Sequence, residues 1–288
     1  MKASAKEARK ARVRQRWTPP DGPLPTGPGN SPDLHPSDEE TLDHLAGEWR
    51  IFQRRRGHRW STDDLLAAWY GCRLAADRGV EVRRHLDLGA GIGSVAMLVA
   101  WKHPECLTVA IEAQTTSADL FRRSVRYNGA TDRIDVRTGD LRDPASVPEG
   151  AVFDLVTGSP PYLTTGEATV SEVPQRAACR FELRGGLDGY LGAMARTLAS
   201  GGVGSLVHHD AAAQRLSDTA AACDLSVVRR RTIVFVEGRT PLIAVYGLQH
   251  RRSAGEGTEV QPPLVIRTAD GGRGAQWSEA RQWMGYPP

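Results

Sequence analysis

The sequence has few cysteines and lacks any hydrophobic run long enough to cross a membrane. Its four cysteines stand at positions 72, 106, 179 and 223, and no two of them have the short spacing of a zinc motif or a disulfide framework. No metal site is therefore expected. The N-terminus lacks the apolar segment of a secretory signal, and the chain has no internal repeats. These absences favour a soluble, cytoplasmic protein without membrane contact, whose thiols stay reduced.

Positive charge is clustered rather than abundant. The net charge is +3 and the sequence pI is about 8.8, which is compatible with a polyanionic partner. Hydrophobic residues make up 40% of the 288, enough for one sizeable α/β domain, expected at residues 45–280. A short tail is expected at 281–288.

Residues 1–44 combine a basic head, from Lys2 to Arg16, with a proline-rich spacer from Pro19 to Pro36. Such a composition buries too little apolar surface to offset its ordering entropy, so the segment is predicted to be disordered. The head is interpreted as an electrostatic arm for nucleic acid, an organelle-targeting segment or a solubilising tail.

The folded domain is expected to open with a strand at 49–53 and a basic turn, which comprises Arg54, Arg55, Arg56, Gly57, His58 and Arg59. This turn is either a phosphate-contacting patch or a solvated charged loop. Ser61 then precedes a run of helix formers at 65–70, which predicts an N-capped helix.

A glycine-spaced turn follows the buried strand predicted at 85–88. Gly89, Gly91 and Gly93 lead into the next helix, where glycine permits close backbone approach and the helix N-terminus offers unpaired amides. The spacing is not the Gly-x-Gly-x-x-Gly of pyrophosphate-binding turns. The next strand, at 107–112, ends in Glu112, where a carboxylate can accept both hydroxyls of a ribose.

Polar residues stand at the carboxyl ends of four successive predicted strands, namely Asp87, Glu112, Asp140 and Ser159. Open α/β sheets bind ligands at this edge. Asp87 would lie beside an amino group, Glu112 at a ribose and Asp140 at the amine of an adenine. A ligand with these three parts is a nucleoside with an amino-acid tail. S-adenosylmethionine fits that description, whereas NAD lacks the tail.

The strand at 153–158 delivers a stiff loop, Ser159-Pro160-Pro161-Tyr162. Consecutive prolines fix φ at about −65° and remove two backbone donors, so the carbonyl groups of the loop are free to accept. A hydroxyl, a free carbonyl and an aromatic ring within four residues suit a planar group that carries an NH2.

Together these motifs resemble those of the S-adenosylmethionine-dependent methyltransferases of planar amino groups, in which the last motif is usually Asn-Pro-Pro-Tyr. More narrowly, residues 49–278 are similar to the bacterial tRNA1(Val) adenine-37 N6-methyltransferase family. The matching features are the arginine-rich hairpin, Ser61-Thr62-Asp63 before a Leu-Leu-Ala helix, and the segments at 174–176, 179–181, 238–242 and 264–267.

The resemblance implies an α/β fold with a Rossmann-like, seven-stranded class I methyltransferase sheet and a C-terminal antiparallel hairpin near 242–247. It implies S-adenosylmethionine as the cofactor, bound by Asp87, Gly89, Gly91, Gly93, Glu112 and Asp140. It implies methyl transfer to adenine N6 in tRNA, with catalytic residues Ser159, Pro160, Pro161 and Tyr162. In that scheme Ser159 and the Pro160 carbonyl accept the amine protons of a splayed-out base, and Tyr162 stacks on it.

The acceptor remains open because Ser159 replaces the usual asparagine. Cytosine N4 methyltransferases also use Ser-Pro-Pro-Tyr, and a protein glutamine amide is a further alternative. A third interpretation is a non-catalytic RNA-binding protein of the same fold, against which the acids Asp87, Glu112 and Asp140 argue. The expected RNA contacts are Arg54, Arg55, Arg56, Arg59 and the N-terminal tail.

The remaining pattern predicts helices at 187–198, closed by Gly201-Gly202, and at 211–223. The residues His208-His209-Asp210 are interpreted as a strand-end loop rather than metal ligands, because no partner cluster accompanies them. Arg229-Arg230-Arg231 interrupts or edges a strand at 227–235. These arginines, with Arg251 and Arg252, would follow an RNA backbone, or they would form a solvated edge that blocks aggregation.

Overall fold

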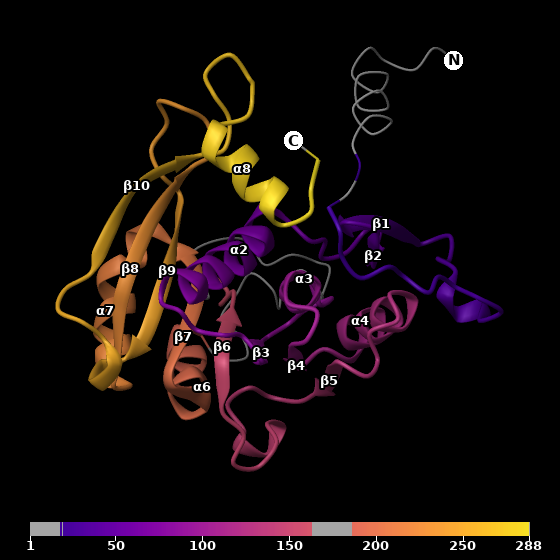
Figure 1. The fold of residues 1–288 in the computed structure, drawn as a ribbon, viewed down its shortest axis with the longest axis horizontal. Coiled ribbons are helices and arrows are strands. Elements are labelled where there is room, and N and C mark those ends of the chain that lie inside the picture. Colours follow the sequence, from indigo (N-terminus) through magenta and orange to yellow (C-terminus); the bar gives the residue numbers. More distant parts are fainter. Residues whose placement is uncertain (1–17, 19, 163–185, 288) are drawn as a thin grey trace.

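The computed structural model describes residues 18, 20–162 and 186–287 (Figure 1). The basic head before residue 18 and the motifs at 174–176 and 179–181 lie outside the described residues. An eight-stranded sheet forms the centre, with the strand order β10-β8-β9-β7-β6-β3-β4-β5. A separate two-stranded sheet, β1 (Glu40–Ala46) and β2 (Trp49–Arg54), packs against helix α4 (Thr115–Tyr127).

Five strands of the sheet run parallel, and the predicted site residues lie at or just after the ends of the first four. The five strands are β3 (Arg84–Leu88), β4 (Leu107–Glu112), β5 (Ile134–Thr138), β6 (Phe153–Gly158) and β7 (Leu198–His209). Their apolar side chains are largely buried, as expected of parallel strands covered on both faces. Because β3 lies between β4 and β6, Asp87 stands opposite Ala110 and Thr157 in the register. The carboxyl ends of four of these strands therefore meet at one edge.

Helices cover both faces of the sheet (Figure 1). The helices α2 (Thr62–Asp77), α3 (Ser94–Lys102) and α8 (Ala275–Trp283) contribute to one hydrophobic core, and α6 (Leu187–Thr197) and α7 (Ala213–Ala222) to the other. Short 3-10 turns are η1 (Pro32–Leu34), η2 (Pro144–Ser146), η3 (Asp210–Ala212) and η4 (Arg251–Ser253).

The α/β class and the seven strands of the expected sheet are observed, but an eighth strand is added. β9 (Ile243–His250) runs antiparallel to both β7 and β8 (Leu225–Val234), and β10 (Glu259–Val265) pairs in parallel with the other side of β8. The expectation of seven strands missed β10, which supplies hydrogen bonds to what would otherwise be an open edge.

The N-terminal segment departs from its prediction. The described part of residues 1–44 contains η1 and most of β1, so the prediction of a disordered tail up to residue 44 is wrong for that part. Arg123 of α4 holds it: its Nη1 pairs with Glu40 at 2.7 Å, and its Nε donates to the Asp33 carbonyl at 2.6 Å. The composition argument failed because this segment is ordered by polar contacts with another element and not by a core of its own.

The C-terminal residues are part of the domain, which corrects the expected tail at 281–288. α8 extends to Trp283, and Met284 and Tyr286 are buried. The Gly47 amide donates to the Gly285 carbonyl at 2.8 Å, which joins the β1–β2 turn to the end of the chain. Two segments far apart in sequence thus satisfy each other's backbone groups.

The arginine triplet does not lie on a sheet edge. β8 passes through it without interruption apart from a bulge, and β10 covers its outer side. The Arg229 side chain is 9% exposed and pairs with Asp77 at 2.8 Å and with Glu259 at 2.7 Å. The interpretation as a protective sheet edge is wrong because β10 and the acidic partners of Arg229 could not be inferred from the local pattern.

The turn after α6 is a smaller correction. The helix ends at Thr197 and β7 begins at once with Leu198, so Gly201 and Gly202 lie inside the strand and do not close the helix.

We expect Arg229→Ala to lower the free energy of unfolding by about 1 to 2 kcal/mol, because it removes a buried guanidinium that pairs with two partly exposed carboxylates. Arg252→Ala is the matched control: Arg252 is exposed, and the change should stay within about 0.5 kcal/mol. Urea unfolding of the two variants measures the difference. Equal stabilities would show that the Arg229 ion pairs contribute nothing.

Candidate functional site

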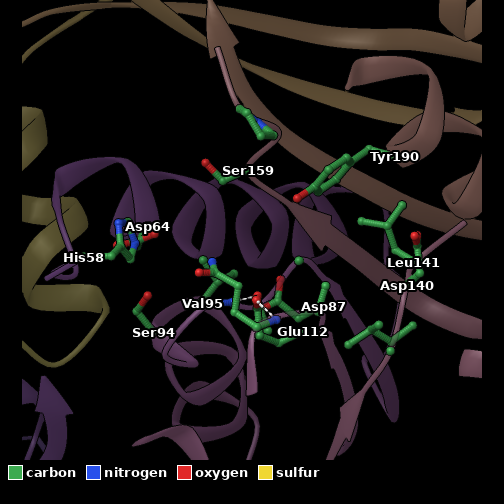
Figure 2. Close-up of a pocket in the computed structure, with 18 residues that line it drawn as sticks. His58, Asp64, Asp87, Ser94, Val95, Glu112, Asp140, Leu141, Ser159 and Tyr190 are labelled. Carbon is green, nitrogen blue, oxygen red and sulfur yellow. Dashed lines mark hydrogen bonds between the residues drawn. The ribbon is translucent and has the colours of Figure 1, made fainter. Parts of the chain in front are cut away.

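A cavity opens at the carboxyl ends of β3, β4, β5 and β6 (Figure 2). In the view of Figure 2, Ser159 and Tyr190 stand above it, and Asp87 and Glu112 stand below it. The cavity wall includes five of the six residues predicted to bind the cofactor and two residues of the loop after β6, namely Asp87, Gly89, Gly91, Glu112, Asp140, Ser159 and Pro161.

Asp87 is the most buried of these carboxylates. It is 1% exposed; its Oδ1 accepts the Thr157 hydroxyl at 2.7 Å and its Oδ2 accepts the Ala96 amide at 3.1 Å. Burial raises the pKa of Asp87 to about 7, a rise that these hydrogen bonds oppose and that the negative charge of Asp64 reinforces. The group is therefore poised to ionise when a positive charge enters the cavity.

A hydrogen-bond relay behind Asp87 fixes its orientation. The single proton of the Thr157 hydroxyl goes to Asp87, so the Thr157 oxygen accepts from His85 Nε2, 2.8 Å away. Burial lowers the pKa of His85 to about 3, which keeps the ring neutral with its proton on Nε2. Thr157 and His85 are fully buried and do not line the cavity, and their pattern in the sequence gave no signal for this role.

Glu112 stands beside Asp87 and organises the glycine turn. Its Oε2 accepts the Gly91 amide at 2.8 Å, and its Oε1 accepts the Gln114 amide at 2.6 Å. A carboxylate oxygen can accept more than one hydrogen bond. The acid at the end of β4 therefore shapes the turn and also offers acceptors at the cavity wall.

Asp64 is a third buried acid at the cavity, and sequence reasoning missed it. It is the N3 residue of a capping box: Ser61 accepts from the Asp63 amide at 3.3 Å, and Asp64 accepts from the Ser61 amide at 2.7 Å. Burial raises the pKa of Asp64 to about 6, against the opposing hydrogen bonds of Ser61 and Ser94. The Ser-x-x-Asp spacing was the available signal, but it indicated only a helix start.

The glycines of the turn have different neighbours. At Gly89, where φ is +64°, an added Cβ would lie 2.0 Å from the Tyr190 hydroxyl, so α6 closes directly over the turn. At Gly93, where φ is +86°, it would lie 2.0 Å from the Phe121 ring. Gly93 is the N-cap of α3 and does not line the cavity, unlike the other predicted cofactor residues.

Asp140 lies on the wall, but its carboxylate is already engaged. Arg142 donates to Asp140 from its backbone amide at 2.9 Å and from its side-chain Nη2 at 2.5 Å. An incoming amine would share the carboxylate with this guanidinium or displace it.

The four residues of the loop after β6 separate into two pairs. Ser159 and Pro161 line the cavity, whereas Pro160 and Tyr162 are not part of its wall. The Tyr162 hydroxyl donates to Asp63 Oδ2 at 2.9 Å, and its ring packs on His209 with the centroids 5.0 Å apart. Burial raises the pKa of Asp63, and the neighbouring Asp64 adds to the rise. The structure thus places Tyr162 against α2 and the end of β7.

The basic turn after β2 borders the cavity through one residue. Arg54, Arg55, Arg56 and Arg59 are exposed, and His58 between them lines the cavity. Arg59 pairs with Asp43 at 2.8 Å. Sequence reasoning listed His58 only as part of the turn, since nothing local indicated that it would face the cavity.

Across residues 18, 20–162 and 186–287, no group of three or more His, Cys, Asp or Glu side chains could hold a metal ion. Within those same ranges, no helix is long and apolar enough to cross a membrane.

The charges of the cavity favour a positively charged ligand with hydroxyl and amine donors. Four acids line it, Asp64, Asp87, Glu112 and Asp140, and His58 is the one basic side chain among its described lining residues. S-adenosylmethionine carries an ammonium group, a sulfonium and a ribose, which match these acceptors in charge and hydrogen-bonding sense. The residues present therefore fit this cofactor.

Comparison with known proteins points to one chemistry. A family model described as the methyltransferase small domain matches residues 73–187. The tRNA1(Val) (adenine(37)-N6)-methyltransferase of Aeromonas hydrophila is 29% identical over 210 residues, 72% of this chain and 81% of that protein. The protein of the same name from Aeromonas salmonicida is 30% identical over 178 residues, 61% of this chain and 69% of that protein.

A second kind of relative acts on protein, and a solved structure shares the fold. The ribosomal protein uL3 glutamine methyltransferase of Bordetella pertussis is 30% identical over 129 residues, 44% of this chain and 40% of that protein. A predicted O-methyltransferase from Agrobacterium tumefaciens superimposes with a TM-score of 0.58 at 18% identity, covering 78% of this chain and 98% of that one. At this identity, the structural likeness bears on the fold alone.

We expect the affinity for S-adenosylmethionine to rise about tenfold from pH 5.5 to pH 7.0. The pKa of Asp87 is raised to about 7 in the free protein, so a proton must leave before an ammonium can pair with it, and that requirement weakens binding at lower pH. Isothermal titration calorimetry across this range measures the slope. Asp87→Asn should bind more weakly and lose most of the pH dependence; an unchanged slope in this variant would contradict the assignment.

Proposed function

The chain belongs to the tRNA1(Val) adenine-37 N6-methyltransferase family and is an S-adenosylmethionine-dependent methyltransferase, and from this we propose that it methylates the exocyclic N6 of an adenine in tRNA. The observation that carries the proposal is the position of Ser159. Its side chain lines the same cavity as Asp87 and Glu112, so an acceptor for an amine and the proposed cofactor site share one space.

The proposed cofactor contacts follow the charges of the wall. Asp87 would face the ammonium group, with Asp64 also on the wall, and Glu112 would accept the ribose hydroxyls while it holds the Gly91 amide. Asp140 would accept from the adenine amine in competition with Arg142. When bound, the cofactor supplies a methyl group activated by the positive charge of its sulfonium.

The loop after β6 would prepare the acceptor. The lone pair of an exocyclic amine is delocalised into its ring, which makes the nitrogen a poor nucleophile. Hydrogen bonds from its two protons to Ser159 Oγ and the Pro160 carbonyl would draw the nitrogen toward tetrahedral geometry and direct its lone pair. The prolines support this role because they hold the loop rigid without donors of their own. The ring of Tyr162, which is partly exposed, would stack on the flipped base.

The proposed RNA contacts lie on the turn after β2. Arg54, Arg55, Arg56 and Arg59 are exposed there, next to a residue that lines the cavity. A phosphate backbone held by this turn would bring its bases to the cavity mouth. The N-terminal basic head is proposed to add to this charge.

A glutamine side-chain amide is the second candidate acceptor. One relative bears the name of a glutamine methyltransferase, and an amide NH2 presents the same two protons on a planar, delocalised nitrogen. Cytosine N4 offers the same geometry. Ser159 is compatible with all three acceptors, because a hydroxyl oxygen makes no contact that distinguishes one planar amine from another.

Nucleoside mass spectrometry of RNA from cells that lack the protein tests the acceptor. We expect loss of N6-methyladenosine from one tRNA and its return when the purified protein and S-adenosylmethionine are added. Unchanged tRNA together with a lost methylglutamine in a protein digest would move the assignment to the second candidate.

Ser159→Ala should reduce the single-turnover methylation rate roughly 100-fold, because one of two acceptors for the amine protons is lost. The dissociation constant for S-adenosylmethionine should change less than about threefold, since Ser159 lies across the cavity from Asp87 and Glu112 (Figure 2). Ser226→Ala, on β8 away from the cavity, is the matched control. A wild-type rate in Ser159→Ala would remove this residue from the mechanism.

A further inference from the structure

We propose that Ser159, Tyr162 and Asp63 form a hydrogen-bond chain that orients the Ser159 oxygen as an acceptor and carries the proton released by the substrate amine to the Asp63 carboxylate. This inference rests on the proposed function to the extent that the acceptor is a planar NH2 group. It concerns the role of the serine, whichever of the three acceptors is correct.

The end of the chain is fixed by a carboxylate. Tyr162 Oη lies 2.9 Å from Asp63 Oδ2, and an ionised carboxylate only accepts, so the phenol donates to it. The lone pairs of the phenol oxygen are then available to accept from another hydroxyl. Ser159 makes a side-chain hydrogen bond to Tyr162, and that bond lowers the pKa of the phenol against the larger effect of burial, which raises it. Because the only proton of the phenol is committed to Asp63, the bond between Ser159 and Tyr162 is one that Ser159 donates.

The direction of these bonds determines what Ser159 offers to the cavity. A hydroxyl has one proton, and here that proton is committed to Tyr162, so Ser159 Oγ can meet the substrate only as an acceptor. An asparagine amide oxygen in this position would accept without any such arrangement. The hydrogen-bond chain therefore compensates for the fact that a serine hydroxyl, unlike an amide oxygen, carries a proton of its own.

Tyr162 and Asp63 are held in place by different elements. The Tyr162 ring packs against His208 and His209 at the end of β7, with centroid separations of 5.4 and 5.0 Å. Asp63 lies in the first turn of α2. The phenol oxygen is thereby fixed between the loop and the helix, and the ring is not free to turn away from Asp63.

The proton balance closes on these three side chains. The amine nitrogen gains a methyl group and loses one N–H proton. That proton passes to Ser159 Oγ as the Ser159 proton passes to Tyr162 Oη and the Tyr162 proton passes to Asp63, which ends as a neutral carboxyl group. Neither hydroxyl becomes charged, because each gains one proton as it gives one away.

The surroundings suit Asp63 to the role of proton acceptor. Burial and the adjacent Asp64 raise its pKa, whereas the hydrogen bond from Tyr162 and the charge of His209 lower it. These are the titratable groups that face it from α2, from the loop after β6 and from β7. A carboxyl group with a raised pKa binds a proton more tightly than an exposed one would.

Nuclear magnetic resonance of protein labelled at tyrosine Cζ tests whether the hydrogen-bond chain exists, and it needs no acceptor substrate. The Tyr162 signal is the one that disappears in Tyr162→Phe. We expect it to shift with pH as Asp63 titrates, to lose that shift in Asp63→Asn, and to move in Ser159→Ala but not in Ser226→Ala. A Tyr162 signal that ignores both substitutions would overturn the chain.

Single-turnover kinetics test what the chain does. With an acceptor that the wild-type protein methylates, Tyr162→Phe and Asp63→Asn should each lower the methylation rate on the order of 100-fold. Each should also make the decrease of that rate at low pH smaller. The double variant should be no slower than either single one, because the two residues act as one unit. Binding of S-adenosylmethionine should stay within twofold in all of them.

The matched controls are Tyr127→Phe, whose ring packs on Phe52, and Asp135→Asn, which pairs with Arg137 on β5. Both should keep the wild-type rate. Wild-type rates and pH profiles in Tyr162→Phe and Asp63→Asn would overturn the catalytic role even if the chain is seen by resonance. A wild-type protein that methylates a glutamine amide but no adenine would instead contradict the proposed function and leave the same kinetic test in force.

Discussion

The burial of Asp87 between β4 and β6 is the constraint on which the cavity depends. A carboxylate that is 1% exposed must have its oxygens satisfied by the protein, and the Thr157 hydroxyl and the Ala96 amide do this. The first bond fixes the register between β3 and β6, and the second fixes the start of α3. The strand order and the glycine turn are thus tied to the same side chain.

The first turn of α2 has two functions because adjacent residues of a helix face different directions. Asp64 closes the capping box and lines the cavity, whereas Asp63 points to Tyr162. Four consecutive residues, 61–64, thus supply the helix cap, part of the cavity wall and the contact with the loop after β6. A substitution in this turn would affect helix stability and the site together.

Sequence patterns located the cavity wall well and its supporting residues poorly. Asp87, Glu112, Asp140 and Ser159 were expected at the ends of four strands, and the sheet places all four at one cavity. Thr157, His85 and Tyr190 were not expected at the site, because their roles depend on pairing across strands or on a helix that folds back from elsewhere. Arg229 was misread for the same reason: its acidic partners come from α2 and β10.

The sequence by itself determined the strands that lead to the cavity, the polar residue at the end of each of them and the stiff loop at Ser159, because periodicity, glycine spacing and proline act over a few residues. Tertiary structure decided the contacts between groups far apart in the sequence, which local patterns do not encode. It ordered the described part of residues 1–44 through Arg123, buried the chain end on the β1–β2 turn, and turned Tyr162 toward Asp63. Each of these depends on groups many residues apart, whose meeting is set by the packing of whole elements.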